Sequence, residues 1–222
     1  MAERRSVLAR TVSTPVILIA LITVIALITM AVGTGPFTRT IVEMLIRVVI
    51  VVGLYVFIGN SGVISFGHIG FMCIGAYAAA WFTIPPAMKR FSLRGLPEIV
   101  ATNQLPWYAS AVIATLLAGI VAYVFGKVLM RLSGIAASIA TFAMLAMINT
   151  VYANWTSVTG GTSSIVGIPL VTGLWTAFTG ACLAILIAWL HSISRSGLAL
   201  RAARDEAVAA SASGVDNVRE RL

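Results

Sequence analysis

Long apolar runs alternate with short polar or charged segments along the whole chain, and this pattern predicts about six membrane-spanning helices. Each run is close to the ~20 residues that a helix needs to cross the hydrocarbon core of a bilayer. The expected spans are residues 15–32, 41–58, 63–82, 107–125, 135–152 and 171–190. The predicted fold class is therefore an all-α integral membrane protein, a polytopic helical bundle in which residues 1–222 form one transmembrane domain.

The first apolar run, Pro15 to Val32, allows two interpretations. It follows Arg4, Arg5 and Arg10 and ends at small residues around Ala31, as a cleaved signal peptide does. However, the run is longer than the about 7–15 residues of a signal-peptide core. The pattern favours an uncleaved transmembrane helix.

A polar stretch rich in glycine, Gly59 to Phe71, interrupts the apolar sequence between the second and third spans. Four glycines, two serines, an asparagine and a histidine lie within it. Non-helical backbone at membrane depth is tolerated only where it is buried in protein or lines a wet cavity. We therefore predict a broken helix around residues 59–70, called the break below, which is either a turn at the membrane face or a discontinuous helix beside a solute pathway. The residues expected near such a translocation path are Ser65, Phe66, Gly67, His68 and Gly70.

Polar side chains in and near the break have structural interpretations as well as functional ones. His68 could act as a proton or ligand switch, but a hydrogen-bonded structural histidine is the more common case. Ser65 could offer its hydroxyl to a solute or cap the following helix, and capping is favoured. Ser138 and Thr141 share one face of the fifth span and are expected to hydrogen-bond between helices rather than to line a pathway.

Composition narrows the class of protein. The chain is 59% hydrophobic and 10% charged, whereas soluble domains are about 25% charged. The net charge of +8 does not indicate a nucleic-acid binder, because the basic residues flank apolar spans. Cys73 and Cys182 lie inside apolar spans without metal-ligand spacing and are expected to be packing residues. The sequence has no G-x-x-x-x-G-K-[ST] loop and no nucleophile–base pair, so we expect a chain that is not an enzyme.

The distribution of basic residues predicts the orientation. If the N-terminus is cytoplasmic, ten Lys and Arg residues fall in inner segments and four in outer ones, which agrees with the positive-inside rule. Both chain ends are then cytoplasmic. Glu43 and Arg47, at the start of the second span, are expected to pair at i, i+4; a solute-facing role is the alternative. The inner residues are Arg4, Arg5, Arg10, Lys127, Arg131, Arg195, Arg201, Arg204, Arg219 and Arg221, and the outer ones are Arg39, Lys89, Arg90 and Arg94.

After the sixth span the chain becomes polar and rich in alanine. Residues 196–216, called the C-terminal segment, favour a helix but contain too few large apolar side chains to span a bilayer. We expect one short cytosolic helix with an Arg201–Asp205 pair and a stop at Gly214. Asp216 is expected to cap a further helix, so the natural protein is expected to be longer. A solvated connector is the alternative interpretation of this segment.

Three sequence motifs lie in register along residues 40–222. Residues 59–77 match G-x-x-G-x-x-S-x-G-H-x-x-F-x-x-I-G-A-Y at every named position. Residues 131–169 match R-L-x-G…A-T…N-W…T-G-G…G-I-P, and residues 201–214 match R-A-x-R-D-x-x-x-A-A-x-x-x-G. Together they resemble the permease subunits of branched-chain amino-acid ABC importers, in particular the LivM-like half of the permease pair.

The resemblance implies a membrane subunit that works with several partners. These are a second permease subunit, two ATPase subunits that bind ATP-Mg, and an extracytoplasmic substrate-binding protein, in a bacterial-type inner (cytoplasmic) membrane. No cofactor is implied on this chain. In such importers a cytosolic loop with an E-A-A-x-x-x-G pattern docks on the ATPase. By this resemblance the residues expected to couple to the ATPase are Arg204, Asp205, Glu206, Ala209, Ala210 and Gly214.

Departures from the family pattern bear on the function. Val208 stands where E-A-A-x-x-x-G has glutamate, and Ala207 stands where many members have an acidic residue. Residues 162–164 read Thr-Ser-Ser where the family has S-[DN]-G, which leaves the solute open between branched-chain amino acids and related small polar solutes such as urea or an amide. A passive channel or secondary transporter that uses the break as its site is the alternative function. A membrane scaffold is a third, although it would need neither the polar break nor a docking helix.

Overall fold

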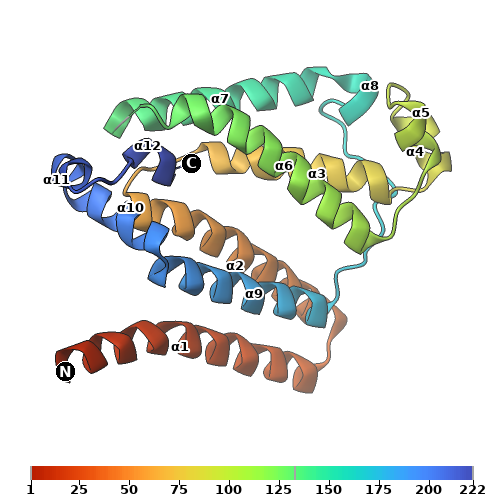
Figure 1. Ribbon diagram of the computed structural model, residues 1–222. Helices are drawn as coiled ribbons and strands as arrows, with labels where there is room; N and C mark the ends of the chain where they lie inside the picture. The colour runs from red at the N-terminus through yellow and green to blue at the C-terminus, as the bar shows by residue number, and fades with distance from the viewer. Residues whose placement is uncertain (1, 133, 222) are drawn as a thin grey trace. The chain divides into compact units, whose positions relative to one another are not determined.

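The computed structural model describes residues 2–132 and 134–221, with side chains described from residue 13 onward. All regular secondary structure in these residues is helical (Figure 1). The chain divides into two compact units, and the divisions fall after Gly62 and after Val171. The first division therefore lies within the break.

The first unit combines the N-terminal helices with the C-terminal part of the chain. It contains α1 (Ala2–Val32), α2 (Gly35–Ser61), α9 (Leu174–Ile193), α10 (Arg195–Asp205) and α11 (Ala207–Ala212), with α12 (Asn217–Arg221) following. Helices α2 and α9 lie side by side, and α1 packs against them in the opposite direction (Figure 1). Apolar and small side chains hold the three together. The buried core consists of Ile22, Leu45, Ala177, Ala181 and Ile185.

The second unit is built on α3 (Gly67–Thr83), α6 (Trp107–Leu129) and α7 (Gly134–Asn154). Helix α3 packs against both α6 and α7. Three short helices lie in the connections: α4 (Pro86–Ser92), α5 (Glu98–Thr102) and α8 (Thr156–Thr159). One cluster of buried side chains joins α3 to α7, and a second joins the end of α3 to the short helices. The clusters are Ile74, Met144 and Ile148, and Ala80, Ile84, Leu93, Leu96 and Val158.

Five of the described helices are long and apolar enough to cross a membrane: α1 from Ser13, α2, α6, α7 and α9. They correspond to five of the six spans that the sequence predicts. The third predicted span is α3, which has 17 residues, at the lower end of the range for a spanning helix. The protein is an all-α polytopic membrane protein.

The two predicted ion pairs, Glu43–Arg47 and Arg201–Asp205, are wrong, because each carboxylate pairs with a different arginine. Glu43 lies 3.7 Å from Arg39, four residues before it, instead of pairing with Arg47. Asp205 accepts from its neighbour Arg204, while Arg201 donates elsewhere. The i, i+4 spacing alone does not distinguish between two basic residues that both lie within reach.

The C-terminal segment also differs from its prediction in one respect. The single helix expected up to Gly214 is two helices, α10 and α11, separated at Glu206, whose backbone is extended (φ −153°, ψ 97°). The helical region does end before Gly214, which has a φ of +86°. Asp216 caps α12 as predicted, because its Oδ1 accepts from the N–H groups of Val218 and Arg219.

Candidate functional site

The break is real, and its non-helical part is shorter than the predicted 59–70. Helix α2 continues to Ser61, and α3 begins at Gly67. Gly62 ends α2 in the left-handed conformation (φ +69°), and its N–H donates to the Ile58 carbonyl. This is a common helix stop, and glycine adopts it without steric cost. The backbone from Gly62 to Phe66 is therefore non-helical.

Two side chains of α7 form hydrogen bonds with backbone groups of this non-helical segment. Ser138 Oγ donates to the Ile64 carbonyl at 2.8 Å, and the Phe66 N–H donates to Thr141 Oγ1 at 3.3 Å. Thr141 in turn donates to the Ser138 carbonyl at 2.9 Å. The predicted interhelical role of Ser138 and Thr141 is confirmed. The residues from Ile64 to Phe66 are held against protein, which is one of the two ways in which irregular backbone survives at membrane depth.

Gly67 and Gly70 let α3 approach α7 closely. A Cβ at Gly67 would lie 2.8 Å from Met144 Cε, and a Cβ at Gly70 would lie 2.8 Å from Ile148 Cδ1. Both distances are shorter than side-chain carbons tolerate without movement. Packing thus provides a reason for both glycines that does not involve a solute.

The other predicted pathway residues lie at the start of α3. Ser65 is buried and precedes the N-cap position, which Phe66 occupies without a side-chain cap bond; the favoured capping role of Ser65 is therefore wrong. Phe66 is 42% exposed, and its ring packs edge-on against Phe142, with ring centroids 5.9 Å apart. His68 is half-buried. The five predicted residues thus lie together at the start of α3 and just before it, as their neighbouring positions in the sequence require.

The C-terminal segment is fastened to the end of α9. Ser194 caps α10 by accepting from the Gly197 N–H at 3.1 Å. A Cβ at Gly197 would overlap the His191 carbonyl oxygen and lie 3.0 Å from its carbon. Arg201 donates to the carbonyls of Gly197 and Ser192, and so closes the same turn.

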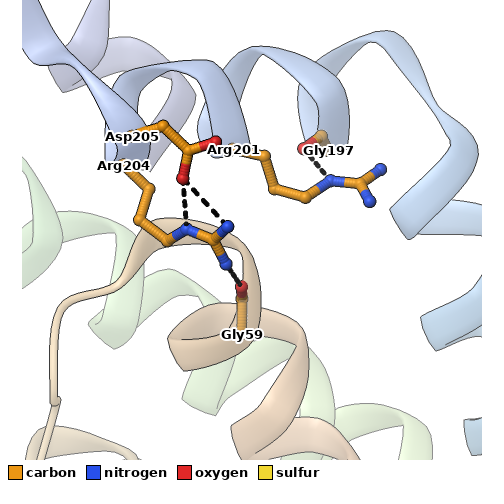
Figure 2. Close-up of polar contacts among 5 residues, drawn as sticks. All are labelled: Gly59, Gly197, Arg201, Arg204 and Asp205. Atoms are coloured by element: carbon orange, nitrogen blue, oxygen red, sulfur yellow. Dashed lines mark hydrogen bonds and ion pairs between the residues drawn. The ribbon is translucent and has the colours of Figure 1, made fainter.

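Arg204 makes a contact that sequence analysis missed. Its Nη1 donates to the Gly59 carbonyl at 2.8 Å, while Asp205 Oδ1 accepts from its Nε at 3.0 Å (Figure 2). A residue predicted for ATPase coupling is therefore bound to a residue of the break. Gly59 and Arg204 are 145 positions apart in the sequence, so no local sequence pattern predicts their contact.

The predicted coupling residues differ in accessibility. Arg204, Asp205, Glu206, Ala209 and Gly214 are exposed, whereas Ala210 is only 6% exposed within this chain. Val208, which sequence analysis treated as a departure from the family pattern, is 77% exposed. Val208 is therefore accessible to a partner chain, as the polar side chains beside it are.

Two further buried polar residues were missed. Thr159 is completely buried, and its hydroxyl lies 2.6 Å from the Tyr152 carbonyl and accepts from the Gly161 N–H at 3.2 Å. Its hydrogen bonds join the end of α7 to the turn that follows, which gives the Thr-Gly-Gly motif a structural role.

Lys89, predicted as an outer loop charge, is buried with Nζ 2.8 Å from the Val100 carbonyl and 2.6 Å from that of Asn103. Burial lowers the pKa of Lys89 below its ordinary value.

Comparison of the sequence with known proteins identifies the family of this chain. Among the described residues there is no group of His, Cys, Asp and Glu that could hold a metal ion. Searches of curated proteins and of solved structures gave no significant match. A family model matches residues 36–222, which include the break, the α7 contacts and the C-terminal segment. The chain belongs to the family described as branched-chain amino acid transport system / permease component.

Proposed function

We propose that residues 1–222 form the permease domain of an ABC importer that carries branched-chain amino acids or a related small polar solute. The observation that carries this proposal, beyond the family itself, is the C-terminal segment. It presents exposed polar side chains and Val208 while Arg204 bonds to the end of α2. A permease that is driven by a separate ATPase subunit needs a surface on which that subunit can dock, whereas a passive channel does not.

The partners follow from the family and from what the chain lacks. Its sequence has no phosphate-binding loop of the Walker type, so ATP-Mg would be bound and hydrolysed by two ATPase subunits. A second permease subunit and an extracytoplasmic binding protein would complete the importer. The surface offered to the ATPase comprises Arg204, Asp205, Glu206, Val208, Ala209 and Gly214, with Ala210 packed behind it.

The proposed location is a bacterial-type inner membrane, with both chain ends in the cytoplasm. Helices α1 and α9 run in opposite directions (Figure 1), so the basic N-terminus and the C-terminal segment lie at the same end of the first unit. Cysteines placed at Ser163 and Ser211, in a Cys73→Ala/Cys182→Ala background, test the orientation. An impermeant thiol reagent added outside should label the first and spare the second; the reverse result contradicts the proposal.

The proposed translocation path passes Ser65, Phe66, Gly67, His68 and Gly70. Gly67→Leu is a poor test, because a larger side chain there meets Met144 and would disturb packing whether or not a solute passes. Phe66→Leu is better, because Phe66 is 42% exposed and loss of its ring leaves the contacts of both glycines in place. We expect a changed KM for uptake with unchanged complex assembly. An unaltered KM would argue against a path at Phe66.

The central test of function is uptake into vesicles that contain the whole transporter. Radiolabelled leucine should accumulate only when ATP and an active ATPase are present. Accumulation that is independent of ATP would favour the alternative, a passive channel or secondary transporter. Val208→Asp should reduce co-purification of the ATPase, while Val166→Asp, at a valine that is 63% exposed and outside the C-terminal segment, should not.

A further inference from the structure

We infer that Arg204 is a positioning residue that ties the C-terminal segment to the last turn of α2, so that movement of the docked segment acts on the break. The inference rests on the proposed function, since it needs a partner that moves the segment. It assigns to Arg204 a role inside the chain, distinct from any contact that Arg204 makes with the ATPase.

The guanidinium of Arg204 is divided between two acceptors. Nε and Nη2 bond to Asp205 Oδ1 at 3.0 and 2.9 Å, which leaves Nη1 aimed at the Gly59 carbonyl (Figure 2). The last carbonyls of a helix are the ones that take partners from outside the helix, and a cation at this end also interacts favourably with the helix dipole. Asp205 therefore orients Arg204, and Arg204 holds the end of α2.

A second contact of the same side chain joins the same two elements. A Cβ at Gly62 would overlap Arg204 Cγ and lie 2.9 Å from its Cδ. The aliphatic stem of Arg204 thus occupies the space that a side chain at Gly62 would need. Gly62 is also the residue at which α2 stops, so Arg204 rests directly on the first residue of the non-helical segment.

Arg201, one turn earlier on the same helix, provides the comparison. Its bonds go to Gly197 and Ser192, so it stabilises the turn between α9 and α10 and does not reach α2. Helix α10 is further anchored by the buried side chains of Leu200 and Ala203. Loss of Arg204 should therefore leave α10 in place while loosening its link to the break.

The experiment uses the complete transporter in vesicles and measures ATPase co-purification, ATP hydrolysis and solute uptake per ATP hydrolysed. In Arg204→Gln, uptake per ATP hydrolysed by the complexes that still assemble should fall about tenfold, the loss expected for one charged hydrogen bond, whatever the substitution does to the amount of ATPase that co-purifies. Arg204→Lys should restore part of the uptake, because an ammonium can donate to Gly59. Arg201→Gln is the matched control and should keep the ratio. An unchanged ratio in Arg204→Gln overturns the inference.

A double-mutant cycle separates the internal role from contact with the ATPase. Gly62→Ala should reduce uptake per ATP in the wild-type background, because the new methyl group displaces Arg204, and should cost clearly less in an Arg204→Ala background. The strain of alanine at φ +69° is the same in both backgrounds and cancels. Gly53→Ala, with no atom within 4 Å of the added Cβ, is the control within α2.

The outcomes of the two arms are distinguishable. Additive losses for Gly62→Ala and Arg204→Ala, with normal ATP-driven uptake in the wild type, would overturn the inference and leave the proposed function intact. A wild-type complex that shows no ATP dependence would instead overturn the proposed function, and the inference with it.

Discussion

The turn between α9 and α10 allows the most quantitative prediction. Gly197 is the third residue of α10, and its backbone lies against the last turn of α9. Alanine at this position would place a methyl group onto the His191 carbonyl, 3.0 Å from the carbonyl carbon and 3.2 Å from Ser192 Cα. These are backbone atoms, which cannot rotate away as the end of a side chain can. The two helices would have to separate.

The size of the effect follows from two opposing contributions. Alanine is more stable than glycine inside a helix by about 0.5–1 kcal/mol. Overpacking typically costs about 1–3 kcal/mol, and overlap with backbone belongs at the upper end of that range. The free energy of unfolding of Gly197→Ala should therefore fall by about 2 kcal/mol. The contacts of Arg201 with Gly197 and Ser192 would be strained as well.

Gly180→Ala is the matched control, because it lies inside α9 and has no atom within 4 Å of an added Cβ. It should gain stability by about 0.5–1 kcal/mol, so the two substitutions should differ in sign. Unfolding of the purified protein in mixed micelles with increasing SDS measures both. If Gly197→Ala is as stable as Gly180→Ala, the close approach of α10 to α9 is wrong, and the placement of Arg204 loses its support.

Two further predictions concern the buried polar residues of the second unit. Thr159→Val should cost about 1–3 kcal/mol, because the Gly161 N–H loses its acceptor inside the protein, whereas Thr159→Ser keeps the hydroxyl and should cost less in the same unfolding assay. Lys89→Met should lower the thermal midpoint, because Nζ no longer bonds the carbonyls of Val100 and Asn103. Since burial lowers the folded-state pKa of Lys89, the unfolded chain binds more protons between that pKa and about 10.5, and wild-type stability should rise with pH across this window. Lys89→Met should lack that rise, and an identical pH profile in both proteins would contradict the burial of a titrating lysine.

The broad architecture could be predicted from the sequence, because apolar length is a direct physical requirement of the bilayer. The spans at α1, α2, α6, α7 and α9 all overlap their predicted ranges. The break could be predicted from composition, since four glycines, two serines, an asparagine and a histidine stand close together between two apolar runs. The limits of its non-helical part could not be predicted, because Gly59 and Gly67 are compatible with a helix and, within the break, only Gly62 has a positive φ.

Partners of individual side chains were the weakest part of the sequence interpretation. The pairs Glu43–Arg47 and Arg201–Asp205 obey the correct helical spacing, yet Arg39 and Arg204 take the two carboxylates. Lys89 is predicted only as an outer loop charge, although its Nζ is hydrogen-bonded to two carbonyls of its own loop. Each of these outcomes depends on where a loop or a neighbouring helix returns in space, which local sequence does not encode.

The glycines of the break show why a motif alone does not identify a functional surface. Their surroundings differ: Gly62 has a positive φ and lies under Arg204, Gly67 and Gly70 both face α7, and Gly59 meets the movable ring of Tyr55. A solute pathway is required by none of these contacts. Large substitutions at Gly67 or Gly70 would therefore disturb the packing of α3 on α7, at Met144 and Ile148, whatever the path of the solute. Of the five predicted pathway residues, Ser65, Gly67 and Gly70 are buried, whereas Phe66 is exposed and His68 half-buried, so a change in KM would be informative at Phe66 and His68.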